Sequence, residues 1–119
     1  MMNEAVTTAS KQVVERYFDM WNTGDVSAAP DILSQDWIDH AHPEVVGPAG
    51  VQRAIEQIRA AQPDLHFHIE RILADADRIA AIGSVRQGRD LNAPGTDLIW
   101  LVRVADGRMA EMWTYRSTA

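Results

Sequence analysis

The stretch "TDLIWLVRVADGRMAEMWTYR", residues 96–116, reads as two strands joined by Asp106-Gly107, a pair typical of a two-residue β-hairpin turn. With that turn, Trp100 would lie opposite Trp113. Further opposite pairs would be Val102 with Glu111 and Leu98 with Tyr115, and the other face would carry Ile99, Leu101, Ala110 and Met112. Both faces would be largely apolar, so we expect helices and a cavity to cover one face and a second subunit to cover the other.

The rest of the chain places helices before strands. Apolar residues at helical spacing predict a helix over residues 10–22 and another over 47–64, which ends at Pro63-Asp64. A short helix over 26–33 and a short strand over 36–41 lie between them. Further strands are expected over residues 65–73, 78–88, 96–104 and 108–116. Helices followed by an antiparallel meander indicate an α+β fold.

Composition limits the class of protein. The 119 residues fit one domain and carry a net charge of −6, from 17 acidic and 11 basic residues, which argues against nucleic-acid binding. There is no cysteine, so thiolate chemistry and cysteine-based metal sites are excluded. The opening "MMNEAVTTAS" lacks the features of a signal peptide, and no apolar run approaches the roughly 20 residues that cross a bilayer. We therefore expect a cytoplasmic protein without a membrane partner.

The order of three motifs carries a resemblance. "DWIDHAHP", "QPDLHFHIERILADADRIA" and "VRVADGRMAEMW" resemble the SnoaL-like polyketide cyclase family, of the ketosteroid-isomerase and nuclear-transport-factor-2-like superfamily. The resemblance runs from about Val13 to Trp113, and we take residues 1–119 as a single SnoaL-like domain. It implies a cone-shaped α+β barrel, with N-terminal helices packed on a curved antiparallel sheet around an apolar pocket. It also implies a homodimer, and we expect no cofactor.

Two features depart from the family pattern. Several cyclases of the family carry a catalytic aspartate shortly after the Glu-x-Trp motif, whereas this chain continues from Trp113 as Thr114-Tyr115-Arg116. The segment "RQGRDLNAPG" is also shorter than the corresponding loop of the cyclases. Both departures leave open a role other than ordinary polyketide cyclisation.

Asp39 and His40 are the first catalytic candidates. They end the short strand before a proline, in the region where ketosteroid isomerases keep their general base. Strand alternation puts the two side chains on opposite faces, so only one of them can point straight into a cavity. An imidazole, or a carboxylate in an apolar pocket, can serve as a base near neutral pH. Tyr17 could donate a hydrogen bond to a substrate oxygen.

Other side chains are candidates for substrate binding. They are four tryptophans, a histidine and a glutamate: Trp21, Trp37, Trp100, Trp113, His42 and Glu111. Core packing is the competing explanation for the tryptophans, and pairing with an arginine is the competing explanation for Glu111. His40 and His42 alone make an incomplete site, so we expect no metal. His66 and His68 are expected at the surface or in an interface.

These residues favour a cofactor-independent isomerase, cyclase or lyase that moves a proton next to a carbonyl of an apolar small molecule. His40 or Asp39 would be the base, and Tyr17 would stabilise the developing oxyanion. The alternative is a ligand-binding or dimerisation module of the same fold without catalysis. The missing carboxylate after Trp113 favours that alternative.

Overall fold

The computed structural model describes residues 4–116 and contains every helix and strand expected from the sequence. In chain order the elements are α1 (Glu4–Thr23), α2 (Ala29–Ile32), β1 (Leu33–Asp39), α3 (Gly47–Ala61), β2 (Leu65–Asp75), β3 (Arg78–Gln87), β4 (Gly95–Ala105) and β5 (Arg108–Arg116). The first helix begins at Glu4 and not at Ser10, since no glycine or proline interrupts the residues between them. Among residues 4–116, no helix is long and apolar enough to cross a membrane.

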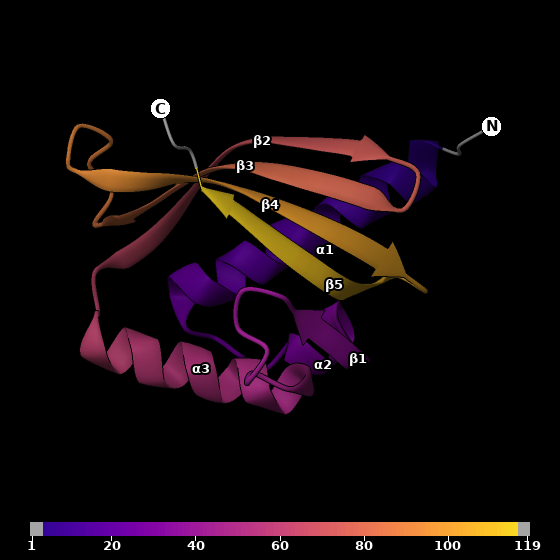
Figure 1. Ribbon diagram of the computed structural model, residues 1–119, viewed down its shortest axis with the longest axis horizontal. Helices are drawn as coiled ribbons and strands as arrows, with labels where there is room; N and C mark the ends of the chain where they lie inside the picture. Colours follow the sequence, from indigo (N-terminus) through magenta and orange to yellow (C-terminus); the bar gives the residue numbers. More distant parts are fainter. Residues whose placement is uncertain (1–3, 117–119) are drawn as a thin grey trace.

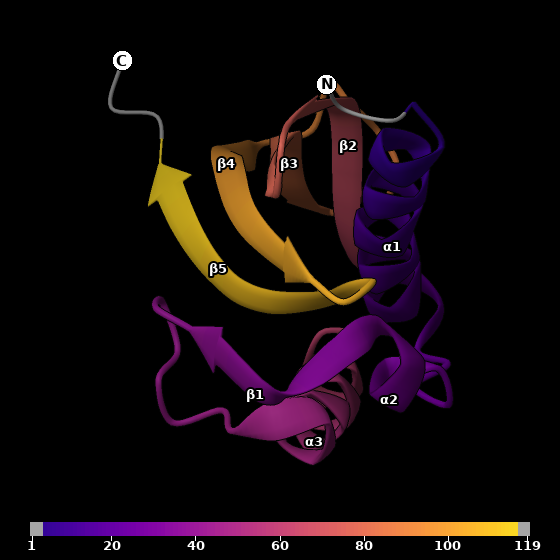
Figure 2. The same cartoon turned by 90° about the vertical axis from the view of Figure 1, so that its right-hand side faces the viewer.

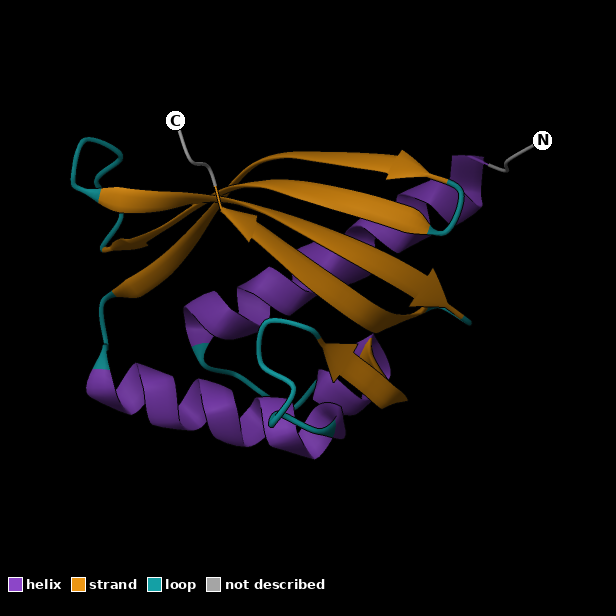
Figure 3. Cartoon of the chain, viewed as in Figure 1, coloured by secondary structure: helices purple, strands orange, loops and turns teal. Residues whose placement is uncertain are grey.

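One sheet of five strands, in the order β1-β5-β4-β3-β2, forms the frame of the molecule (Figure 3). Strands β2 to β5 pair in antiparallel fashion, as the meander predicted. The expectation of a wholly antiparallel sheet was wrong for β1, because β1 runs parallel to β5 and Asp39 lies opposite Met112. Parallel pairing is possible here because helix α3 and three strands separate the two partners along the chain.

The sheet curves over the helices and is not closed. Figures 1 and 2 show α1 against the concave side of the sheet, with α3 and β1 on the far side of the opening. This arrangement confirms the expected α+β cone. Phe18 of α1 joins it to the sheet, since its ring centroid lies 4.8 Å from Trp100 and 5.8 Å from Phe67. Asn22 both donates to and accepts from the backbone of Phe67, which ties α1 to the edge strand β2.

The β4–β5 hairpin has the predicted turn but not the predicted register. Asp106 and Gly107 both have positive φ, and Ala105 pairs with Arg108 as a two-residue turn requires. Beyond the turn, Val104 pairs with Met109 while Arg103 pairs with Glu111, so Ala110 is an extra residue. A bulge of this kind exchanges the faces of everything beyond it.

The bulge corrects the predicted cross-strand pairs. Trp100 lies opposite Thr114, and Leu101 lies opposite Trp113. The remaining observed pairs are Val102 with Met112, Ile99 with Tyr115, and Leu98 with Arg116. Trp113 therefore leaves the concave face that it was predicted to share with Trp100, and Met112 takes a place there.

Candidate functional site

A cavity of about 410 Å³ opens between α3 and the concave face of the sheet. Its apolar wall comes from inward-facing strand positions and from residues of α1 and α3, including Phe67, Val85, Leu98, Trp100, Met112, Trp21, Val51 and Ile58. Its polar lining consists of Tyr17, Asp39, His42, Glu44, Gln57 and Thr114. This mixture of an apolar wall and a few polar groups is typical of a small-molecule site.

Asp39 is the buried acid of this cavity. The residue is only 7% exposed, because the alternation of β1 and its parallel pairing with β5 turn its side chain inward. Burial raises the pKa of Asp39 above its ordinary value, although the Ala41 N–H and the charge of His42 oppose that rise. The Ala41 N–H donates to Asp39 Oδ1 over 3.0 Å and fixes the carboxyl group. Its burial and its raised pKa make Asp39 a candidate for proton exchange with a ligand.

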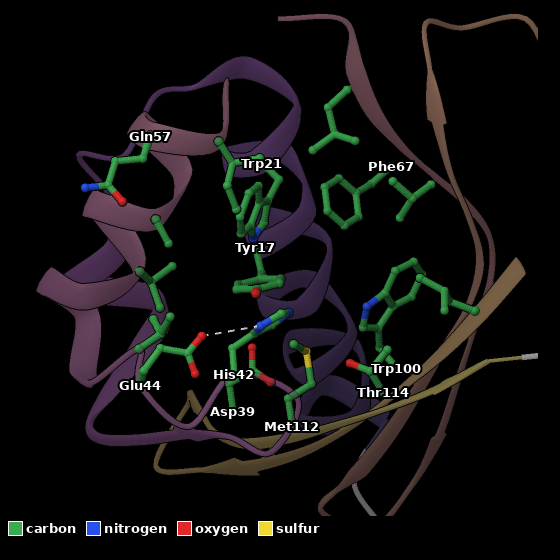
Figure 4. Close-up of a pocket in the computed structure, with 17 residues that line it drawn as sticks. Tyr17, Trp21, Asp39, His42, Glu44, Gln57, Phe67, Trp100, Met112 and Thr114 are labelled. Atoms are coloured by element: carbon green, nitrogen blue, oxygen red, sulfur yellow. Dashed lines mark ion pairs between the residues drawn. The ribbon is translucent and has the colours of Figure 1, made fainter. Parts of the chain in front are cut away.

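Tyr17 brings a hydroxyl to the same side of the cavity. Figure 4 shows its oxygen near the Asp39 carboxylate, with the His42 ring beside them. Burial raises the pKa of Tyr17 above its ordinary value, and a hydrogen bond with Trp21 opposes the rise. The phenol consequently stays protonated and remains a donor. Figure 4 also shows the indole nitrogen of Trp100 turned toward the cavity, so a second donor is available.

His42 and Glu44 occupy the rim. Both line the cavity, yet their side chains are 65% and 71% exposed, and His42 Nδ1 lies 3.6 Å from Glu44 Oε1. Glu44, Gln57 and Thr114 were missed in the sequence, since a polar residue on a helix or in a loop carries no signal of facing a cavity. Thr114 became a lining residue only through the bulge at Ala110.

His40 does not reach the cavity, which corrects the expectation that it shares the site. It lies on the opposite face of β1, where its ring stacks on Trp113 at 4.9 Å and its Nε2 lies 2.6 Å from Glu111 Oε2. Glu111 also accepts a hydrogen bond from Arg103 over 2.9 Å. Hydrogen bonds from His40 and Arg103 hold the pKa of Glu111 below its usual range. The candidate substrate contacts Trp113 and Glu111 therefore belong to the outer face.

The remaining candidates have other surroundings. Trp37 is buried against Tyr17, at 5.9 Å between ring centroids, and it does not line the cavity. His66 and His68 lie side by side on β2, with centroids 4.5 Å apart, and Leu65 and Phe67 face the cavity in their place. Within residues 4–116, no group of three or more histidine, cysteine, aspartate or glutamate side chains could hold a metal ion.

Structural comparison places this geometry among known folds. A Bacillus cereus protein with a provisional polyketide cyclase name aligns with a TM-score of 0.81 at 23% identity, over 98% of this chain and 79% of its own. TsrD from Streptomyces laurentii aligns with a TM-score of 0.75 at 23% identity, over 98% of this chain and 92% of TsrD. A SnoaL-like polyketide cyclase from Agrobacterium tumefaciens aligns with a TM-score of 0.71 at 16% identity, over 92% of this chain and 91% of the cyclase. Likeness at these identities shows the fold.

The sequence itself carries the family signature. A search among curated protein sequences finds no significant match. The profile of the SnoaL-like domain, in contrast, matches residues 14–112, which run from the middle of α1 to the middle of β5 and include the inward-facing Asp39 and Tyr17. The chain therefore belongs to the SnoaL-like domain family.

Proposed function

We propose that the protein is a cofactor-independent enzyme that moves a proton next to a carbonyl group of a small apolar molecule, as an isomerase or cyclase. One observation carries the proposal: a buried carboxyl group with a raised pKa shares an apolar cavity with a buried phenol. The carboxylate of Asp39 is the base, and the hydroxyl of Tyr17 is the oxyanion donor. Names of structural relatives as polyketide cyclases support this reaction class.

The chemistry follows from the two positions. Asp39 removes a proton from the carbon beside the carbonyl, and the electrons of that C–H bond move toward the carbonyl oxygen. Tyr17 donates a hydrogen bond to the negative charge that develops there, which is usually the larger source of rate enhancement. The resulting enolate either takes the proton back at another carbon, which is isomerisation, or attacks a second carbonyl, which is cyclisation. The apolar wall excludes water and keeps Asp39 a stronger base.

The β,γ-unsaturated octalone, a bicyclic ketone, is a suitable probe because its conversion to the conjugated enone is read directly by ultraviolet absorbance. We expect the wild-type protein to accelerate this conversion. Asp39→Asn keeps the oxygen that accepts the Ala41 N–H but cannot take up a proton, so the rate should fall about 10²- to 10⁴-fold. Tyr17→Phe should cost about 10²-fold or more, as for other oxyanion donors. Equal rates for Asp39→Asn and wild type would refute Asp39 as the base.

A ligand-binding module without catalysis is the second candidate. Thr114 lines the cavity just after Trp113, where no carboxylate is present, and this favours simple binding. The two candidates differ in one result. A binding module would hold the planar phenol 2-naphthol in the cavity, detected by quenching of tryptophan fluorescence, and would leave the octalone unchanged.

A further inference from the structure

The segment after β1 folds back over the end of that strand. The backbone N–H of His42 donates to the Asp39 carbonyl over 3.1 Å, and the N–H of Val45 donates to the His42 carbonyl over 3.0 Å. The Ala41 N–H donates to the Asp39 side chain over 3.0 Å. These bonds hold His42 at the rim of the cavity, three residues after Asp39 in the chain.

His42 differs from Asp39 in its access to water. Its side chain is 65% exposed while Asp39 is 7% exposed, although both line the same cavity. Glu44 Oε1 faces His42 Nδ1 at 3.6 Å, which leaves Nε2 as the free ring nitrogen. Figure 4 shows the His42 ring between Tyr17 and Asp39, with the Glu44 carboxylate to one side of it. The charge of His42 lowers the pKa of Asp39 and the charge of Glu44 raises it, so both side chains lie within electrostatic reach of the Asp39 carboxyl group.

We infer that His42, oriented by Glu44, carries protons between the buried Asp39 carboxyl group and bulk water. The inference rests on the proposed function of Asp39 as the base. After Asp39 has taken the substrate proton, its O–H bond breaks and the proton passes to His42 Nε2, directly or along one water molecule. The imidazolium then loses this proton to water, and a solvent proton returns along the same path to Asp39, which delivers it to the enolate carbon. Imidazole suits this exchange because it gains and loses protons near neutral pH.

The relay has a consequence that the rate alone does not reveal. Without it, the proton taken from the octalone stays on Asp39 and returns to the same molecule. With it, the proton exchanges with solvent before return. In D₂O, the fraction of conjugated octalone that carries deuterium at the carbon receiving the proton reports the exchange, and mass spectrometry with NMR measures it.

We expect His42→Gln to lower the deuterated fraction of the product, compared at equal conversion, by about fivefold or more. Glu44→Gln should lower the fraction by a smaller factor, because the ring loses its orientation but keeps its nitrogens. His40→Gln is the matched control, since His40 is also exposed at the end of β1 but faces away from the cavity. It should leave the deuterated fraction unchanged.

The outcomes separate this inference from the proposed function. If Asp39→Asn converts octalone as fast as wild type, both fail. If Asp39→Asn is inactive and His42→Gln incorporates deuterium like wild type, the relay alone is wrong. A wild-type product that retains the substrate proton also overturns the relay. Should His42→Gln fail to fold, Glu44→Gln decides the question, because it leaves every backbone hydrogen bond of the segment in place.

Discussion

Asp39 and His40 are neighbours in the chain and have opposite surroundings. Asp39 faces an apolar cavity, where burial works against its charge. His40 faces outward, where its ring stacks on Trp113 and its Nε2 contacts the Glu111 carboxylate. A titratable group that is poorly stabilised in its charged form is poised to react, whereas a paired and stacked group contributes to stability. We therefore propose a chemical role for the inner residue Asp39 and a structural role for the outer residue His40.

The bulge at Ala110 bends β5 and fills part of the core, so its removal should have the largest effect on stability. Deleting Ala110 would leave the observed pairs beyond it in register, with Met112 still inward and Trp113 still outward, but would straighten β5 and remove a buried side chain. We expect a loss of about 3 kcal/mol, measured in thermal melts followed by circular dichroism. Ala110→Gly keeps the extra residue and should cost only about 1 kcal/mol. Equal stability of the two variants would mean that the bulge is not required.

This bulge also marks the limit of sequence-based prediction here. The helices, the strands and the turn at Asp106-Gly107 were predictable, because each depends on local periodicity or turn chemistry. The bulge was not, since Ala110 has none of the glycine or proline signals of an irregular strand. The parallel pairing of β1 with β5 joins segments far apart in the chain, so nothing local indicated it. Alternation alone could not decide whether Asp39 or His40 faces inward.

The outer face of the sheet exposes apolar side chains. Two cross-strand rows lie there, one with Leu73, Ala80, Leu101 and Trp113, and one with Arg71, Ile82, Ile99 and Tyr115. Ile99 is 43% and Tyr115 is 52% exposed, so much apolar surface faces outward. We propose that two copies of the chain pair through this face. Burial at about 25 cal/mol per Å² supplies the driving force.

Sedimentation measures this association. The wild-type protein should sediment as a dimer, and Ile99→Arg should shift it to a monomer by burying an unpaired charge, with Kd raised by about 10²-fold or more. Lys11→Arg, on α1 and away from this face, should leave the dimer intact. A wild-type monomer at high protein concentration would contradict the pairing.

The pH dependence of stability tests whether Asp39 is buried at a cost to the fold. Because burial raises the pKa of Asp39 in the folded state, the folded protein binds more protons than the unfolded chain between the two pKa values. Wild-type stability therefore falls as pH rises above the ordinary aspartate value of about 3.9 and stays lower at neutral pH. Asp39→Asn removes this loss, so its Tm should exceed the wild-type Tm by a few degrees at pH 7.

The gain of Asp39→Asn should shrink as the pH approaches 4, where the wild-type carboxyl group is itself neutral. The groups that face Asp39 are Tyr17 from α1 and His42 and Glu44 from the rim. Repeating the scan with His42→Gln tests their influence, because the charge of His42 lowers the pKa of Asp39. A lower Tm for Asp39→Asn at neutral pH would show that ionised Asp39 stabilises the fold.

His40→Ala should have the smallest effect on stability. It should lower the Tm slightly and keep activity, whereas Asp39→Asn should raise the Tm and lose activity. The variant loses the ring stack on Trp113 and the contact with Glu111, but Glu111 keeps its hydrogen bond from Arg103. A stacked pair of this kind contributes about 1 kcal/mol, so Tm should fall slightly. The backbone N–H of His40 still donates to the Met112 carbonyl over 3.0 Å and holds the end of β1, so Asp39 should keep its place. Octalone conversion should accordingly stay within about threefold of wild type. A large loss of rate at unchanged Tm would instead mean that the outward face of β1 takes part in the chemistry.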